Sequence, residues 1–132
     1  MEIVKLFDAE LILMEYLWEN TTVTAAQMAD YLLKNYGWKK SSTYIVLKRL
    51  EGKGVLRKES PQYHVIPLVT REQVQIADTS SVLDKLFGGS FTSLFANFLS
   101  SDQVSDHTLD ELQQMIEEKK KQKVLQGSIP RD

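Results

Sequence analysis

The feature that most constrains the fold is a run of basic residues from Lys34 to Lys58, set within a clear order of secondary-structure signals. The run holds eight Lys or Arg residues and one acid, although the whole chain has a formal net charge of -2. Gly37 separates two helical patterns, and Gly54 stops the second before two short β-prone stretches. This order predicts a helix-turn-helix followed by a wing, and the clustered positive charge indicates a nucleic-acid-binding face.

Composition places the chain among globular proteins and excludes several kinds of site. Its 132 residues, 42% hydrophobic and 26% charged, suit one small domain with an appended region. The chain contains no cysteine, which excludes disulfides, thiolate metal sites and cysteine nucleophiles. Acidic residues interrupt every apolar run near the N-terminus, so we expect no signal peptide, no membrane insertion and a cytoplasmic location.

Local signals predict the elements of the N-terminal half. The expected elements are helices over residues 9–19, 24–37 and 40–52 and wing strands over residues 55–59 and 62–67. Asp8 is the expected N-cap of the first helix, a capping box begins the second at Thr24, and Gly37 ends it. Apolar spacing predicts these buried positions: Leu11, Met14, Leu17, Trp18, Met28, Leu32, Thr43, Val46, Leu47 and Leu50.

The second half predicts three helical segments, over residues 70–87, 91–99 and 108–122. Capping boxes at Thr70 and Thr108 mark two of the starts. About sixty residues rarely enclose a core by themselves, so we expect the apolar faces to pair in a C2 homodimer. The residues expected at that interface are Leu83, Leu86, Phe87, Phe91, Leu94, Phe95, Phe98, Leu99, Leu112 and Ile116.

The expected fold class is therefore mainly α with a small β wing: an N-terminal winged helix-turn-helix plus a C-terminal helical dimerisation region. We expect a DNA-binding domain in residues 1–69, a dimerisation domain in residues 70–123 and a disordered tail in residues 124–132. A homodimer of this kind presents two recognition helices to the two half-sites of a double-stranded DNA operator.

The third helix and the wing supply the candidate DNA contacts. The base-facing candidates are Ser41, Ser42, Tyr44, Ile45, Lys48 and Arg49, and the phosphate-facing candidates are Lys39, Lys40, Lys53, Arg57 and Lys58. An ordinary solvated helix face is the alternative for the first group. For Arg49, a DNA contact and a structural salt bridge remain equally open.

Several motifs resemble the penicillinase-repressor family. They are the segment WKKSSTYIVLKRLEGKG (residues 38–54), the segment KLFGGSF (residues 85–91) and the tripeptide Ala96-Asn97-Phe98. The resemblance implies a winged helix, C-terminal dimerisation, repression at promoter dyads and no enzymatic activity. In β-lactam-responsive members a membrane sensor with a metalloprotease domain leads to cleavage at an Asn-Phe bond, which matches Asn97-Phe98 here.

Departures from the family pattern and other classes of function remain to be weighed. Tyr44 and Ile45 stand where the family usually has a basic residue and a threonine, so the operator is expected to differ from the family's TACA/TGTA half-sites. Without cysteines, copper sensing through thiolates is excluded. His64 and His107 lack further ligands nearby in sequence, so we expect neither a metal nor a cofactor. The alternatives are a regulator controlled by a small ligand and a protein-interaction module that does not bind DNA. An enzyme is not expected, because the chain contains no recognisable catalytic motif.

Overall fold

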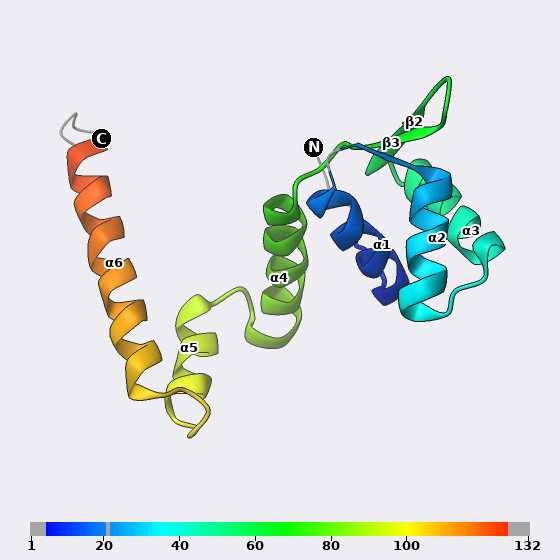
Figure 1. Cartoon of the computed structure of the whole chain (residues 1–132). Coiled ribbons are helices and arrows are strands. Elements are labelled where there is room, and N and C mark those ends of the chain that lie inside the picture. Colours follow the sequence, from blue (N-terminus) through cyan, green and yellow to red (C-terminus); the bar gives the residue numbers. More distant parts are fainter. Residues whose placement is uncertain (1–4, 21, 127–132) are drawn as a thin grey trace. The chain divides into compact units, whose positions relative to one another are not determined.

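The computed structural model describes residues 5–20 and 22–126 and is helical with one small sheet (Figure 1). The elements in chain order are α1 (Asp8–Glu19), β1 (Val23–Thr24), α2 (Ala25–Tyr36), α3 (Lys40–Gly52), β2 (Leu56–Glu59), β3 (His64–Pro67), α4 (Arg71–Phe87), α5 (Phe91–Leu99) and α6 (Asp106–Gln126). This inventory confirms the expected fold class. Two units divide the chain, one up to Val82 and one from Leu83 onward, so the boundary falls inside α4.

The sheet in the first unit has three antiparallel strands in the order β1-β3-β2. β2 and β3 form the expected wing, with Lys58 opposite Val65. β1 pairs with the other edge of β3, with Val23 also opposite Val65. The prediction of two strands was therefore wrong by one strand, because a two-residue strand is too short to show an alternating pattern.

The helix starts of the first unit show which capping signals the chain uses. At α2 the Thr24 hydroxyl accepts from the Gln27 N–H at 3.1 Å, and the Gln27 side chain accepts from the Thr24 N–H at 2.9 Å, which confirms the predicted capping box. At α1 the prediction was wrong, because Phe7 is the N-cap and Asp8 the first helical residue. The Glu10 carboxylate accepts from the Phe7 N–H at 2.8 Å and satisfies this end of the helix.

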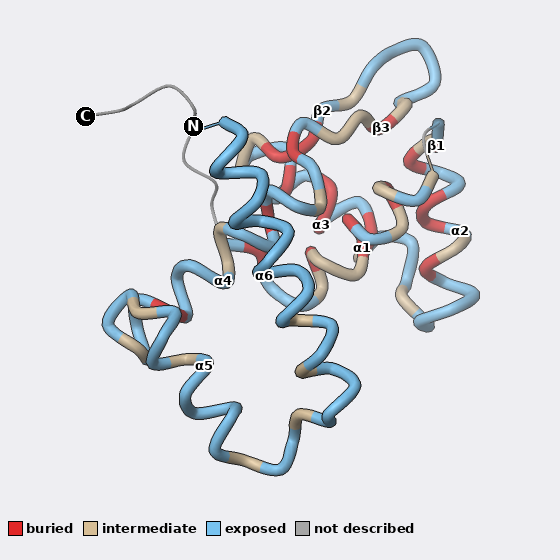
Figure 2. The backbone as a smooth tube through the Cα atoms, turned by 90° about the vertical axis from the view of Figure 1, so that its left-hand side faces the viewer, coloured by how far each residue is buried: buried red, intermediate tan, exposed pale blue. Residues whose placement is uncertain are grey.

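The core of the first unit joins the three helices to the sheet (Figure 2). The buried residues of α1, α2 and α3 are Glu10, Leu13, Met14, Leu17, Ala25, Met28, Ala29, Leu32, Thr43, Val46, Leu47 and Leu50. The prediction for α1 was partly wrong: Leu11 and Trp18 are only partly buried at the core edge, and Leu13 takes the central place. Each fully buried Leu or Val stabilises the folded state by about 1.5–3 kcal/mol. With this many buried side chains, the first unit has a hydrophobic core of its own.

The second unit buries far less. Neither α5 nor α6 contains a buried residue, and Leu83 alone is buried among residues 83–126. Figure 2 accordingly draws both helices in the colours of intermediate and exposed residues. Large apolar side chains therefore remain in water: Phe91 is 57% exposed, Phe95 46%, Phe98 44%, Leu99 57% and Ile116 56%.

α6 begins earlier and ends later than expected. The Ser105 hydroxyl accepts from the Thr108 N–H at 3.1 Å, so Ser105 caps the helix and the predicted start at Thr108 was wrong. The helix continues to Gln126, which makes residues 124–126 helical rather than disordered. The remaining part of the predicted tail, residues 127–132, lies outside the described residues. None of the helices in residues 5–20 and 22–126 combines the length and apolar character needed to cross a membrane.

Candidate nucleic-acid interface

The outer face of α3 presents four side chains at helical spacing. Thr43, Val46, Leu47 and Leu50 point into the core, and the opposite stripe consists of Ser41, Tyr44, Ile45 and Lys48, all of them exposed. Tyr44 is 47% exposed and Ile45 59% exposed. Apolar groups of this size on an otherwise polar face can contact thymine methyls, while the hydroxyls and the ammonium can bond to base edges or phosphates.

The remaining two base-facing candidates lie beside this stripe. Ser42 is half-buried and lines a small hollow with Trp38 and Lys39. Arg49 is exposed, but its Nε lies 3.5 Å from the Glu10 carboxylate on α1. The structure thus contains the salt bridge that was one of the two alternatives for Arg49.

A buried carboxylate connects α1 to the end of α3. Glu10 is fully buried and accepts from Lys53 Nζ at 2.7 Å. Lys53 also donates to the Lys5 carbonyl at 3.1 Å and lies 4.5 Å above the Phe7 ring. Its ammonium thus faces a buried acid, whereas the acids that pair with Lys40, Arg57 and Lys58 are exposed.

The pKa of Glu10 reflects opposing influences. Burial raises the pKa of the carboxyl group, but the hydrogen bonds from Lys53 and the Phe7 N–H and the charges of Lys53 and Arg49 outweigh burial and lower it below its ordinary value. Glu10 is therefore ionised at neutral pH. Sequence reasoning missed this residue because its partners lie on α3 and just beyond it.

Folding also brings acids to several other predicted phosphate contacts. Lys40 lies 3.0 Å from Asp30, Lys58 lies 3.5 Å from Glu51, and Arg57 pairs with Glu59. Within the described part of the chain, Lys34, Lys39 and Lys48 form no ion pair. Exposed ion pairs contribute only about 0–1 kcal/mol, so these cations can exchange a carboxylate for a phosphate.

The first turn of α3 offers backbone donors as well. Lys39 is the N-cap, and no side chain caps this end of the helix. Unbonded N–H groups at a helix start carry partial positive charge and suit a phosphate oxygen. Lys39 and Lys40 at the same end add full positive charges. The α2–α3 turn and the start of α3 are therefore together suited to hold the phosphate backbone of a nucleic acid.

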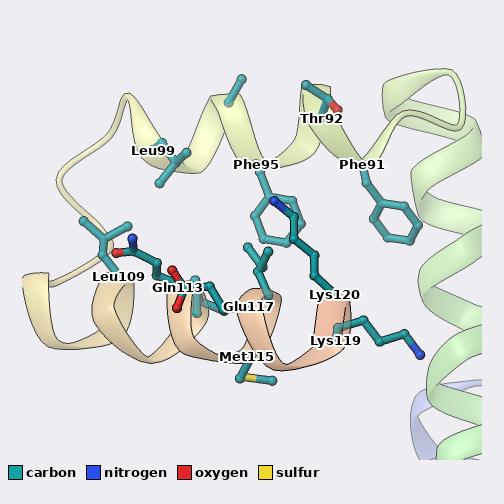
Figure 3. A pocket seen from close by; sticks show the side chains of 13 residues that line it. Phe91, Thr92, Phe95, Leu99, Leu109, Gln113, Met115, Glu117, Lys119 and Lys120 are labelled. Atoms are coloured by element: carbon teal, nitrogen blue, oxygen red, sulfur yellow. The ribbon is translucent and has the colours of Figure 1, made fainter. Parts of the chain in front are cut away.

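The predicted dimerisation residues divide into three groups. Phe91, Phe95, Leu99, Leu112 and Ile116 line an open apolar groove of about 820 Å³ between α5 and α6 (Figure 3). Gln113, Glu117, Lys119 and Lys120 supply its polar lining. Leu86 and Phe98 are exposed and Phe87 and Leu94 half-buried, whereas Leu83 is already buried in the single chain.

Asn97 and Phe98 lie in the last turn of α5, where both are exposed. The Asn97 carbonyl accepts from the Ser100 hydroxyl at 3.0 Å, and the Phe98 carbonyl accepts from the Ser101 hydroxyl at 2.8 Å. No cluster of three or more His, Asp or Glu side chains that could hold a metal occurs in residues 5–20 and 22–126.

Comparisons with known proteins find similarity to one family of repressors. The family model for the penicillinase repressor matches residues 6–118. The penicillinase repressor of Bacillus licheniformis is 29% identical over 124 residues, which cover 92% of this chain and 97% of that protein. The methicillin resistance regulatory protein MecI of Staphylococcus aureus is 21% identical over 113 residues, covering 84% and 92%.

Two solved structures are similar to the first part of the chain. One is the solution structure of the DNA-binding domain of the repressor BlaI, with a TM-score of 0.48 and 24% identity over 54% of this chain and 90% of that chain. The other is the monomeric form of Bacillus licheniformis BlaI in complex with the blaP half-operator, with a TM-score of 0.48 and 26% identity over 54% and 89%.

Proposed function

The chain belongs to the penicillinase repressor family, and we propose that it represses transcription by binding, as a homodimer, to a dyad operator in double-stranded DNA. The protein acts by binding DNA and not by catalysing a reaction. A repressor of this kind acts where the chromosome is, so we place it in the cytoplasm. The observation that carries the proposal is the outer face of α3, where large apolar and basic side chains are exposed together.

Contacts to bases are assigned to the outer face of α3 and its edge. We assign Ser41, Ser42, Tyr44, Ile45 and Lys48 to the major groove, because this stripe projects away from the core. Tyr44 and Ile45 supply surfaces for thymine methyls and base edges. This pair differs from the family's usual threonine and basic residue, which supports an operator sequence of its own.

Contacts to phosphates are assigned to Lys39 and Lys40 at the start of α3 and to Arg57 and Lys58 on the wing. Lys53 and Arg49 receive a different role. Their cationic groups face the buried Glu10 carboxylate, so we infer that they hold α3 against α1 and act on DNA indirectly.

Dimerisation is assigned to the second unit. α5 and α6 contain no buried residue, yet they expose four aromatic or leucine side chains on α5 and an apolar groove between them. Burying each Phe or Leu yields about 1.5–3 kcal/mol, so a second copy that covers this surface supplies the missing core. Leu83 is buried already and adds little to such an interface.

We assign release of repression to cleavage of the Asn97-Phe98 bond by the protease of a membrane sensor pathway. The bond is exposed and near the end of α5, so local fraying of one helical turn would present it to a protease. Cleavage separates α6 from the rest of the chain and divides the apolar surface, which removes the basis of the dimer.

Control by a small apolar ligand is the second candidate. The groove of about 820 Å³ has the size of many ligand sites, which supports this candidate. A dimer that covers the groove leaves no room for such a ligand. Competition therefore separates the two: a ligand-controlled regulator would bind a hydrophobic dye in the groove as a dimer, whereas our proposal expects dye binding only in dissociated protein.

The test of the DNA-binding face compares two exposed isoleucines on helices. Ile45 lies on α3 and Ile76 on α4, and they are 59% and 68% exposed. Duplexes are first selected from a random library with the wild-type protein, and affinities are then measured by fluorescence anisotropy. We expect Ile45→Ala to lose about 1 kcal/mol or more on the selected duplex and Ile76→Ala to lose nothing measurable. Equal affinities of both variants would remove α3 as the reading helix.

A further inference from the structure

Arg71, the first residue of α4, is held by three side chains of α1. Its guanidinium donates to the Glu15 carboxylate from Nη2 at 2.8 Å and from Nε at 3.2 Å. Nη2 also lies 3.5 Å from Glu19, and Cζ lies 5.6 Å from the centre of the Trp18 ring. The hydrogen bond to Glu15 raises the pKa of Arg71, so the guanidinium stays charged at physiological pH.

The residues next to Arg71 add further anchors at the same point. Trp18 Nε1 donates to the Val69 carbonyl at 2.9 Å. Thr70 and Gln73 exchange the two hydrogen bonds of a capping box, at 2.9 and 3.0 Å. Val69 and Val74 are both buried in the core of the first unit. The first turn of α4 is thus fixed to α1 by backbone, polar and apolar contacts together.

This cluster is not suited to contact DNA itself. One guanidinium beside the carboxylates of Glu15 and Glu19 leaves a net negative charge at this point. Such a charge repels phosphate, and Nε and Nη2 of Arg71 already face the two carboxylates. The contacts instead determine the direction in which α4 leaves the winged helix, and α4 is one continuous helix to Phe87.

We propose that Arg71 is a positioning residue that restricts the spacing between the two half-sites accepted by the dimer. This inference rests on the proposed function, because it requires a dyad operator and a dimer formed beyond α4. Each added base pair turns one half-site by about 34° and moves it by about 3.4 Å relative to the other. A rigid start of α4 lets the dimer match only one arrangement of the two half-sites, whereas a flexible start lets it match several.

The experiment uses the full chain and a dyad selected from a random duplex library by the wild-type protein. The selected half-sites are kept, and base pairs are added to or removed from the spacer one at a time. The variants are Arg71→Ala and the double variant Glu15→Gln/Glu19→Gln, which removes both negative charges and keeps the arginine. Gln75→Ala is the matched control, since Gln75 is exposed on α4 and its side chain forms no hydrogen bond within the described residues.

We expect the wild-type protein and Gln75→Ala to prefer one spacing strongly. In both test variants, that preference over neighbouring spacings should fall by about three- to tenfold, the loss expected for exposed ion pairs plus a cation–π contact. Affinity for an isolated half-site should stay close to the wild-type value, which a defect in the DNA-binding face itself would lower.

Two results would overturn the inference. Either test variant could keep the full spacing preference, or it could lose affinity equally at every spacing and on the half-site. A different result addresses the proposed function: if the wild-type protein selects single half-sites instead of dyads, the dimeric operator fails, and the spacing role fails with it.

Discussion

Removing the charge of Glu10 should loosen α3, although this residue is buried on α1 and is not itself a proposed DNA contact. Glu10 is fully buried, and Lys53, whose side chain is 20% exposed, donates to it at 2.7 Å. The Glu10→Gln variant keeps the size of the side chain and an acceptor for the Phe7 N–H. It removes the attraction for Lys53 and Arg49, and with it the polar connection between α1 and the end of α3.

The magnitude follows from how well each contact is shielded. A hydrogen bond to a charged group contributes about 1.5–3 kcal/mol, and the partly exposed Lys53 belongs in the lower half of that range. Arg49 is 52% exposed at 3.5 Å and adds about 0.5 kcal/mol or less. We therefore expect Glu10→Gln to lose about 1.5–2.5 kcal/mol of unfolding free energy at pH 7.

The difference should depend on pH in one direction. The pKa of Glu10 is lower in the folded protein than in the unfolded chain, so its contribution is complete above the unfolded pKa of about 4.3. The contribution is lost as the pH falls through the folded pKa, because both states then hold the proton. The wild-type protein should consequently approach the stability of Glu10→Gln in acid.

Urea unfolding followed by circular dichroism and by the fluorescence of Trp18 and Trp38 measures this difference at several pH values. Glu51→Gln is the matched control, since Glu51 is a partly exposed acid whose pair with Lys58 is 3.5 Å long. We expect it to change stability by less than about 0.5 kcal/mol. A Glu10→Gln variant as stable as the control at pH 7, or a deficit that does not shrink in acid, would refute the reasoning.

Three further predictions concern DNA binding and assembly. In the double variant Lys40→Ala/Lys58→Ala, binding to all duplexes should weaken alike, and salt titration should show the slope of log K against log salt flattening by about 0.9 per lost contact; an unchanged slope contradicts the phosphate assignment. Tyr44→Ala or Ser42→Ala should lose roughly 1–3 kcal/mol of binding free energy on the selected operator and little on random DNA. Equal losses on both would mean that these residues contact the DNA backbone instead of base edges. A fragment of residues 1–97 should keep a folded first unit, sediment largely as a monomer and lose tight operator binding, and a dimer of unchanged strength would locate the interface elsewhere.

The sequence correctly predicted several features whose deciding contacts are local. The Thr24 capping box and the left-handed turn at Gly37, whose φ is 69°, involve residues within a few positions of each other. The bounds of α3 follow in the same way from the turn before it and Gly54 after it. The stripe from Thr43 to Leu50 also needs only the helical repeat, and its buried face was predicted correctly.

The sequence was insufficient wherever the partner comes from another element. The count of basic residues between Lys34 and Lys58 ignored Glu10 and Asp30, which lie outside the run and pair with Lys53, Arg49 and Lys40 only after folding. β1 exists because β3 offers it an edge.

At α6 two local capping signals compete. Ser105 prevails over Thr108 because the earlier start adds a helical turn and puts Asp106 at the positive end of the helix.

With the proposed dimer, the unequal burial of the two units would make operator binding depend on protein concentration. The first unit has its own core, so the reading face of α3 is formed in the monomer. The second unit exposes its apolar helices in the single chain, and the proposed dimer would cover them, so we infer that the folding of this unit is linked to dimerisation. A monomer then binds one half-site weakly, and tethering of two reading faces raises the affinity by about two to four orders of magnitude. Repression therefore responds to any event that separates the subunits, even when every DNA contact remains intact.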